Sequence, residues 1–189
     1  MHTQLERSSV ANEDFASGSG LSASEFKAAF RNHPGGVALV TARGKEGPVA
    51  MTVSSLVSVS AEPPLLAFSL SDLSRSSATI RQAETIVVHL LDSARVQLAK
   101  LGATGGVDRF ADASAWSQLE SGEPYFHAAP IRILCRIVHE VRAGAATIVI
   151  AHASRLVSEP LEEVPVLDAA PLVYHNRHWH ALSGLSEIE

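Results

Sequence analysis

The feature that most limits how this chain can fold is a pair of long extended segments, residues 131–141 and 147–157, separated by Gly144. From residue 131 to 137 every second residue is apolar, and the positions between them include Arg132 and Arg136. An alternation with a period of two is typical of a strand with one buried face. Because Gly144 supplies a turn between the segments, the sequence predicts a long antiparallel hairpin.

Shorter apolar segments bounded by turn residues follow one another along the rest of the chain. Ser22 and Glu25 have the spacing of a capping box, which predicts the start of a first helix that ends near Pro34. Further helices are expected at 78–83 and 92–101, and strands at 37–43, 48–60, 65–70, 86–91, 172–175 and 179–182. About seven or eight strands with few helices predict a mainly β fold, a closed or nearly closed antiparallel barrel.

The chain divides into a tail and one domain. Residues 1–20 are polar, end in a Gly-Ser-Gly stretch and show no periodicity, so a flexible tail is expected there. Residues 21–189 are enough for a single domain with a sizeable core.

Charge and cysteine content exclude several classes of function. The formal net charge is −5 and Lys and Arg form no block, which argues against nucleic-acid or membrane partners. No apolar run approaches the roughly 18 residues that a membrane span needs. The single cysteine, Cys135, cannot form an intrachain disulfide or a thiolate metal cage. We therefore expect a cytoplasmic protein with a reduced, buried thiol.

Small and hydroxyl residues are unusually dense from Val49 to Ser60. An edge strand with hydroxyls facing water would explain this composition. The alternative is a strand whose backbone is left accessible, so that a planar polar ring can lie against it. A flavin fits such a wall, because one edge of its ring needs amide and hydroxyl partners while the other end needs apolar contacts.

A serine-rich loop, residues 69–77, precedes the predicted helix at 78–83. Free amides and the positive end of a helix dipole bind phosphate, and Arg75 would add a fixed charge. The same serines could instead only cap the helix and close the turn. Asp72 opposes an anion there unless its carboxylate points away.

Several segments stand in an order that is characteristic of one family. They are Phe30-Arg31 before a Gly-Gly-Val-Ala-Leu-Val-Thr strand, Thr52-Val53-Ser54-Ser55, Ser58-Val59-Ser60, Pro63-Pro64, Phe68-Ser69-Leu70, Asp108-Arg109-Phe110 and Pro171-Leu172-Val173-Tyr174. In this order the chain, from about residue 21 to 182, resembles the short-chain flavin reductases. The resemblance implies the FMN-binding split β-barrel, a Greek-key fold with a few flanking helices, and a homodimer.

The resemblance also implies a function and a set of site residues. NADH or NADPH would reduce FMN or FAD, and the reduced flavin would pass to a partner monooxygenase. Flavin contacts would come from Val49, Ala50, Met51, Thr52, Ser54, Ser55, Ser69, Leu70 and Ser71, and phosphate contacts from Arg75, Ser76 and Lys100. Contacts to the nicotinamide or the pocket would come from Ala146, Arg109, Phe110, Tyr174 and Arg177. Direct hydride transfer depends on positioning, so no catalytic acid or base is expected.

The chain departs from the family pattern at two places. Ala50 stands where many relatives have glycine, which adds one methyl group beside the ring. At the hairpin turn, relatives often carry Gly-Asp-His, with the histidine beside the nicotinamide, whereas this chain has Gly144-Ala145-Ala146. A flavin-binding carrier without reductase turnover is therefore the alternative function. Oxidase chemistry on a phosphorylated cofactor would need further basic residues that the sequence lacks.

The histidines are not expected to bind a metal. His178 and His180 would share one face of a predicted strand, but no carboxylate accompanies them. Hydrogen bonding to a bound ligand or exposure to solvent is favoured instead. His89 and His152 lie in apolar strands and are expected to be hydrogen-bonded residues of the core.

Overall fold

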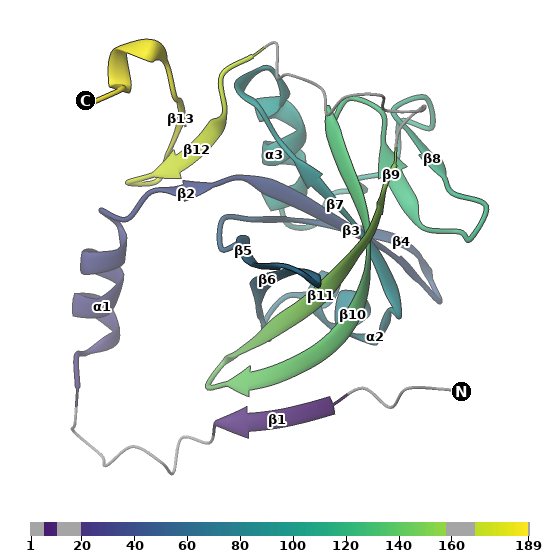
Figure 1. The fold of residues 1–189 in the computed structure, drawn as a ribbon, viewed down its shortest axis with the longest axis horizontal. Coiled ribbons are helices and arrows are strands. Elements are labelled where there is room, and N and C mark those ends of the chain that lie inside the picture. Colours follow the sequence, from purple (N-terminus) through teal and green to yellow (C-terminus); the bar gives the residue numbers. More distant parts are fainter. Residues whose placement is uncertain (1–5, 11–19, 158–168, 189) are drawn as a thin grey trace.

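A computed structural model describes residues 6–10, 20–157 and 169–188, and its main body is one twisted antiparallel sheet (Figure 1). The strand order is β4-β3-β7-β10-β11-β6-β5, with β1 paired to β10 outside this path. These strands are β1 Glu6–Val10, β3 Ala38–Gly44, β4 Gly47–Val53, β5 Val57–Ala61, β6 Pro64–Ser71, β7 Thr85–Leu90, β10 Ile131–Ala143 and β11 Ala146–Leu156. The long hairpin predicted from the alternating pattern is β10 and β11.

The sheet curves into a split barrel because its two edge strands are consecutive in the chain. β4 and β5 lie at opposite ends of the strand order, yet only residues 54–56 join them. Just before β5, the Ser55 hydroxyl accepts a hydrogen bond from the Ser69 N–H of β6 at 2.9 Å, which continues the β5–β6 pairing. The predicted strand at 48–60 is therefore two strands with a bend between them, and the bend forms the split.

The barrel interior is packed with side chains. Phe68, Leu70, Val88 and Val149 are buried there, together with other aliphatic residues from six strands. A second cluster joins Leu39 and Ala50 to the loop region after α3. Burial of this apolar surface is the main stabilising term in the fold. The interior therefore leaves room for a ligand only at the rim or on the outside.

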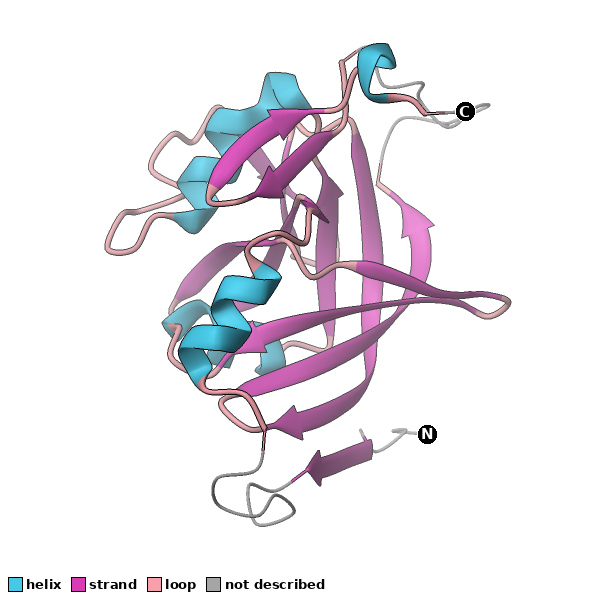
Figure 2. Cartoon of the chain, turned by 90° about the vertical axis from the view of Figure 1, so that its left-hand side faces the viewer, coloured by secondary structure: helices cyan, strands magenta, loops and turns pink. Residues whose placement is uncertain are grey.

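In the described part of the chain, three α-helices and two small sheets surround this sheet (Figures 1 and 2). They are α1 Ala23–Phe30, α2 Arg75–Gln82, α3 Val96–Ala103, the pair β8 Trp116–Gln118 and β9 Pro124–Phe126, and the sheet β13-β12-β2 of His178–Ala181, Leu172–His175 and Gly35–Gly36. Short 3₁₀ turns occupy Ser93–Arg95 and Gly184–Ser186. In both views α1 lies below the β12–β13 hairpin.

The predicted capping box is confirmed at α1. The Glu25 N–H donates to the Ser22 hydroxyl at 3.3 Å, and the Ser22 N–H donates to the Glu25 carboxylate at 2.9 Å. These bonds lower the pKa of Glu25, with the side-chain contact to Ser22 as the largest cause. None of the helix residues is buried, and the half-exposed rings of Phe26 and Phe30 stack with centroids 4.5 Å apart. The apolar stripe of α1 is thus left uncovered in the single chain.

Other elements differ from expectation in their bounds. α2 starts at Arg75 rather than 78, because the serine loop already adopts helical geometry. The helix expected from Asp92 begins with a 3₁₀ turn, and the Asp92 carboxylate pairs with Arg95 instead of capping the helix. Five residues of the expected tail, Glu6–Val10, form β1, parallel to β10; residues 1–5 and 11–19 lie outside the described part.

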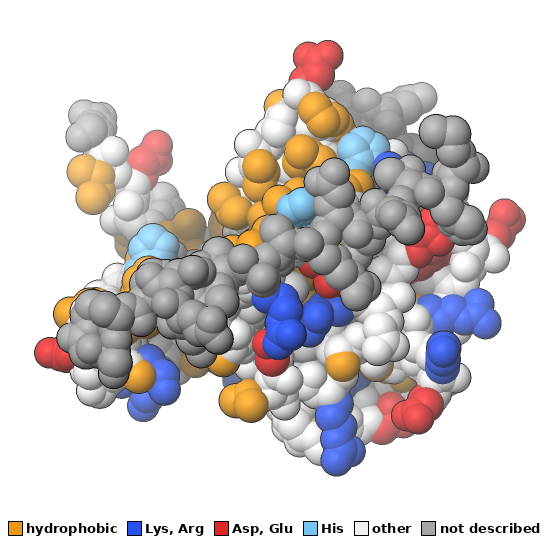
Figure 3. Space-filling view, turned by 90° about the horizontal axis from the view of Figure 1, so that it is seen from below, with side chains coloured by type: hydrophobic (Ala, Val, Ile, Leu, Met, Phe, Trp, Pro, Cys, Tyr) orange, Lys and Arg blue, Asp and Glu red, His pale blue; other side chains and the backbone are white. Residues whose placement is uncertain are grey.

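Charged side chains do not gather by sign on the face that Figure 3 shows, where Lys and Arg are interspersed with Asp and Glu. Among the described residues, no helix is both long and apolar enough to span a membrane.

Candidate functional site

Two clefts on the surface contain residues that the sequence singled out. The first, which we call the α1 cleft, lies between α1, the β4–β5 junction and the β12–β13 hairpin, with a volume of about 760 Å³. The second, the α2 cleft, lies between the β3–β4 turn and α2, with a volume of about 530 Å³. Both volumes are in the range of small-molecule sites.

The α1 cleft has a polar wall and an aromatic wall. Ser54, Ser55 and Ser69 form the polar wall, and the Ser55 hydroxyl is held by both the N–H and the carbonyl oxygen of Ser69, at 2.9 and 3.4 Å. Phe26 and Phe30 form the opposite wall. A flat ring that is polar on one edge and apolar elsewhere is complementary to these two surfaces.

The β12–β13 turn brings Tyr174 and Arg177 to the same cleft. Asn176 and Arg177 both have positive φ, 49° and 64°, as the two central residues of a type I′ hairpin turn do. Asn176 donates its N–H to the Arg31 carbonyl at 3.0 Å, which ties the turn to the end of α1. Arginine is uncommon in this backbone region, and holding it there places a cation at the mouth of the cleft.

The α2 cleft combines a helix N-terminus with basic side chains. Ser74, the N-cap residue, makes no side-chain bond to the helix amides; its hydroxyl donates to the Met51 sulfur at 3.5 Å. Ser76 is buried on the cleft wall, and Arg75 is exposed beside it. Uncapped amides at the positive end of a helix bind anions well.

Arg109 supplies a further cation beside this helix N-terminus. Its Nη1 donates to the Ser76 hydroxyl at 3.4 Å. Its Nε and Nη2 donate to the carbonyls of Leu101 and Thr104, at 3.3 and 2.6 Å. Three hydrogen bonds hold the guanidinium in place, so Arg109 connects the end of α3 to the start of α2.

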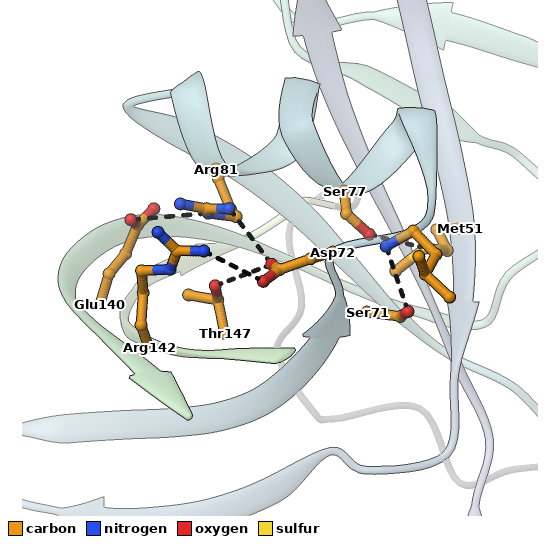
Figure 4. A network of polar contacts seen from close by, with 9 residues as sticks. Met51, Ser71, Asp72, Ser77, Arg81, Glu140, Arg142 and Thr147 are labelled. Carbon is orange, nitrogen blue, oxygen red and sulfur yellow. Dashed lines mark hydrogen bonds and ion pairs between the residues drawn. The ribbon is translucent and has the colours of Figure 1, made fainter. Parts of the chain in front are cut away.

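Asp72 lines neither cleft, and Figure 4 shows its carboxylate facing Arg81, Arg142 and Thr147, which removes the objection to an anion in the serine loop. Its carboxylate pairs with Arg81 at 3.3 Å and Arg142 at 3.6 Å. It also accepts a hydrogen bond from the Thr147 hydroxyl at 3.2 Å, and its N–H donates to the Ala145 carbonyl at 3.0 Å. The negative charge of Asp72 is therefore neutralised by Arg81 of α2 and Arg142 of β10.

Several predicted flavin contacts lie deeper than expected. The side chains of Ala50 and Leu70 are buried in the two cores, so only their backbones could touch a ligand. The Thr52 hydroxyl donates to the Ala99 carbonyl at 2.7 Å and holds α3 against β4. Phe110 stacks on Phe126 at 5.1 Å, so the structure gives it a packing role. Met51 accepts bonds from two serine hydroxyls of the α2 region.

Of the remaining predicted residues, Lys100, Ala146 and Ser71 line neither cleft, so Lys100 is not placed as the second cation for a phosphate in the α2 cleft. Val49 lines the α2 cleft. Lys100 is exposed on α3. Ala146 pairs with Ser71 at the end of the β10–β11 hairpin, so the turn that lacks the family's histidine stands directly beside the loop before α2.

Other lining residues were not predicted. They are chiefly Phe26, Lys27 and His33 at the α1 cleft and Arg43, Lys45 and Thr79 at the α2 cleft. The spacing of Phe26 and Phe30 on one helix face was visible in the sequence, but a stripe of this kind ordinarily marks a core contact. Arg43 and Lys45 belong to a hairpin turn, where charged residues are common for solubility alone.

Titratable groups in the barrel serve the fold. His89 is fully buried; its Nδ1–H donates to the Leu39 carbonyl, and Nε2 accepts the Phe126 N–H, both at 3.1 Å. Burial lowers the pKa of His89 to about 4 and raises the pKa of the Cys135 thiol to about 12. Among the described residues, no group of three or more His, Cys, Asp or Glu side chains is placed to hold a metal ion.

The C-terminal histidines are close to one another. The rings of His178 and His180 are 6.5 Å apart, and the His180 Nε2 lies 3.3 Å from the His175 carbonyl. Both side chains are exposed on β13.

Comparison with known proteins shows what the fold and the sequence resemble. Residues 30–183 match the flavin reductase like domain. The chain is 36% identical over 168 residues to an NADH:FMN oxidoreductase of Rhodococcus qingshengii, covering 89% of this chain and 86% of that protein.

Solved structures share the fold. A flavin reductase domain protein of Arthrobacter matches 87% of this chain and 98% of its own, with a TM-score of 0.77 and 24% identity. An NADH:FAD oxidoreductase of Streptomyces globisporus, solved with NAD and FAD fragments, matches 87% of this chain and 94% of its own, with a TM-score of 0.73 and 22% identity. The matched domain covers nearly all the described residues after α1, and both clefts are built largely from it. This chain belongs to the flavin reductase family.

Proposed function

We propose that this protein is an NADH-dependent flavin reductase, with a ring-binding site in the α1 cleft and a phosphate-binding site at the start of α2. The observation that carries the proposal is the pairing of a polar-and-aromatic cleft with an uncapped helix N-terminus and Arg109. One site suits a flat ring and the other an anion. The family and the 36% identical NADH:FMN oxidoreductase support the same reaction.

The residues of this chain would act by positioning. Ser54 and Ser55 would offer hydroxyl and backbone groups to the ring edge, and Phe26 and Phe30 would exclude water from its face. Arg75, Ser76 and Arg109 would hold the phosphate. The bound flavin supplies the chemistry, since it accepts a hydride directly from the nicotinamide. No described side chain of the clefts has to move a proton, so Ala146 in place of histidine does not prevent the reaction.

We further propose that Tyr174 and Arg177 contact the nicotinamide nucleotide. Both residues line the α1 cleft. Arg177 could pair with a phosphate of the dinucleotide, and the Tyr174 ring, 4.8 Å from Trp179, is held in place for stacking.

Reduced flavin would be handed to a separate monooxygenase in the cytoplasm. A nitrilotriacetate monooxygenase component B homologue of Mycobacterium thermoresistibile and the flavin reductase component of a two-component tryptophan halogenase share this fold. The exposed position of both clefts suits a flavin that leaves after reduction. The reduced thiol expected of buried Cys135 is compatible with a cytoplasmic location.

We also propose a homodimer that covers α1. Leu21, Phe26 and Phe30 are each more than half exposed, as are Val57 and Val59 on edge strand β5. Apolar groups exposed on a helix and on an adjacent sheet edge are typical of an interface. Light scattering of the full chain tests this: a monomer at all micromolar concentrations would contradict it.

The function is tested by NADH oxidation with FMN, FAD and riboflavin in turn, with NADPH in parallel, in air and without oxygen. We expect stimulation by at least one flavin. Flavin binding without stimulated NADH or NADPH oxidation would instead show a carrier. Arg75→Ala should raise the KM for FMN more than the KM for riboflavin, which has no phosphate. An equal effect on both flavins would refute the phosphate site.

A further inference from the structure

The α2 cleft extends beyond the groups needed for a single phosphate. Arg75 and Ser76 lie on its helical side, whereas Arg43 and Lys45 lie on the opposite side, in and beside the turn between β3 and β4. Its volume of about 530 Å³ is in the range that encloses a whole small ligand rather than one ion.

The charges of the cleft favour an anion. Arg43, Lys45 and Arg75 are cationic, and Glu46 is the one acidic residue among those that line it. Asp72, the nearest acidic residue of the loop before α2, is paired with Arg81 and Arg142 outside the cleft. The lining therefore carries an excess of two positive charges, in addition to the positive end of α2.

The shape of the turn is fixed by close packing against α2. A side chain at Gly44 would collide with the Thr79 methyl group and, at 2.8 Å, with the Gly47 carbonyl. Gly47 has φ of +127°, which only glycine adopts readily. The turn is thus held against the helix, so that Lys45 is presented from a defined backbone rather than from a loose loop.

The lining of the cleft also includes apolar side chains. Pro48 and Val49 line it together with the cations. A purine ring can lie on an apolar surface, and an arginine guanidinium can stack on its other face. Cations beside an apolar surface are complementary to an adenosine phosphate.

We propose that the α2 cleft binds the adenosine monophosphate half of flavin adenine dinucleotide, with Lys45 on its second phosphate. This inference rests on the proposed flavin reductase function and extends it to the choice between the two flavins. FMN would use only the helical side of the cleft, at Ser76 and Arg109. FAD would use both sides.

The test compares Lys45→Gln with Arg136→Gln, which removes the same charge from an exposed position of β10 outside both clefts. Dissociation constants for FMN, FAD, riboflavin and ADP are measured by titration of the full chain at low and high salt. Lys45→Gln should weaken FAD about tenfold relative to FMN, the size of one charge-assisted hydrogen bond at a partly exposed site. The effect should shrink at high salt, and ADP binding should weaken in parallel.

Arg136→Gln should leave the ratio of FAD to FMN affinity unchanged. An unchanged ratio in Lys45→Gln, with flavin binding and NADH oxidation intact in the wild type, would overturn the adenylate site and leave the proposed function standing. Absence of flavin binding in the wild type would overturn both. Thermal melting of each variant checks that the turn substitution leaves the fold intact.

Discussion

His89 ties three elements of the barrel together, and its replacement should change how stability depends on pH. The imidazole on β7 donates to Leu39 on β3 and accepts from Phe126 on β9. Because it is fully buried, its pKa in the folded protein falls from 6.5 to about 4. The folded protein therefore holds His89 neutral over a pH range in which the unfolded chain takes up a proton.

The sign and size of the effect follow from this difference. As pH falls below 6.5, protonation stabilises the unfolded chain, so the free energy of unfolding decreases until pH reaches about 4. At 1.36 kcal/mol for each pKa unit, the loss is about 3 kcal/mol. His89→Leu removes this dependence. It also leaves a buried carbonyl and a buried N–H without partners, which costs about 2 kcal/mol or more at neutral pH.

Urea denaturation between pH 7.5 and 4.5, followed by tryptophan fluorescence, measures both the pH dependence of the free energy of unfolding and the loss of stability at neutral pH. We expect the wild type to be the more stable at pH 7.5 and the two curves to approach each other as pH falls. Because the wild type and His89→Leu carry the same carboxylates, the contribution of carboxylate titration cancels in the difference between their stabilities. His178→Leu, at an exposed position, should change stability by less than about 0.5 kcal/mol. A stability difference that is constant across this range would refute the buried neutral imidazole.

Two further substitutions probe the surroundings of the clefts. Gly102→Ala should destabilise the protein by about 1–3 kcal/mol, because the new methyl group meets the side chain of Thr52 and its backbone N at 3.1 Å. Thermal melting measures the loss. Gly105→Ala, whose methyl group meets nothing within 4 Å, is the matched control. Asp72→Asn should cost about 1 kcal/mol at low salt by weakening the ion pair with Arg81. A loss that stays the same in 1 M salt would show that the pairing is not its cause.

The elements of the sheet were largely predictable, since each strand alternates or is apolar enough to identify. The hairpin at 131–157 is the clearest case, because period-two alternation over a long segment fits no helix. The break at Ser54 was not predictable. It depends on which strands pair: residues up to Val53 pair with β3, whereas residues from Val57 pair with β6.

The sequence indicated which types of residue lie at the site, but not the directions of their side chains. Arg75 and four of the predicted serines, Ser54, Ser55, Ser69 and Ser76, line the clefts, whereas Ser71 lines neither. Residue type could not show that Leu70 and Ala50 face the cores. A strand has two faces, and the way the sheet curves decides which face is buried. The direction of Asp72 depends on Arg142, which is distant in sequence. Arg43 and Lys45 resemble ordinary turn residues until α2 is placed beside them.

The split between β4 and β5 has a consequence for the speed of ligand exchange. The barrel interior is filled by residues such as Phe68 and Leu70, whereas both clefts lie outside it. A molecule bound there can leave without breaking a main-chain hydrogen bond between strands or opening the core. Its residence time is therefore set by its own contacts and by movement of α1, and not by the slow opening of the sheet. A protein built in this way can keep a rigid barrel and still release its ligand at every turnover.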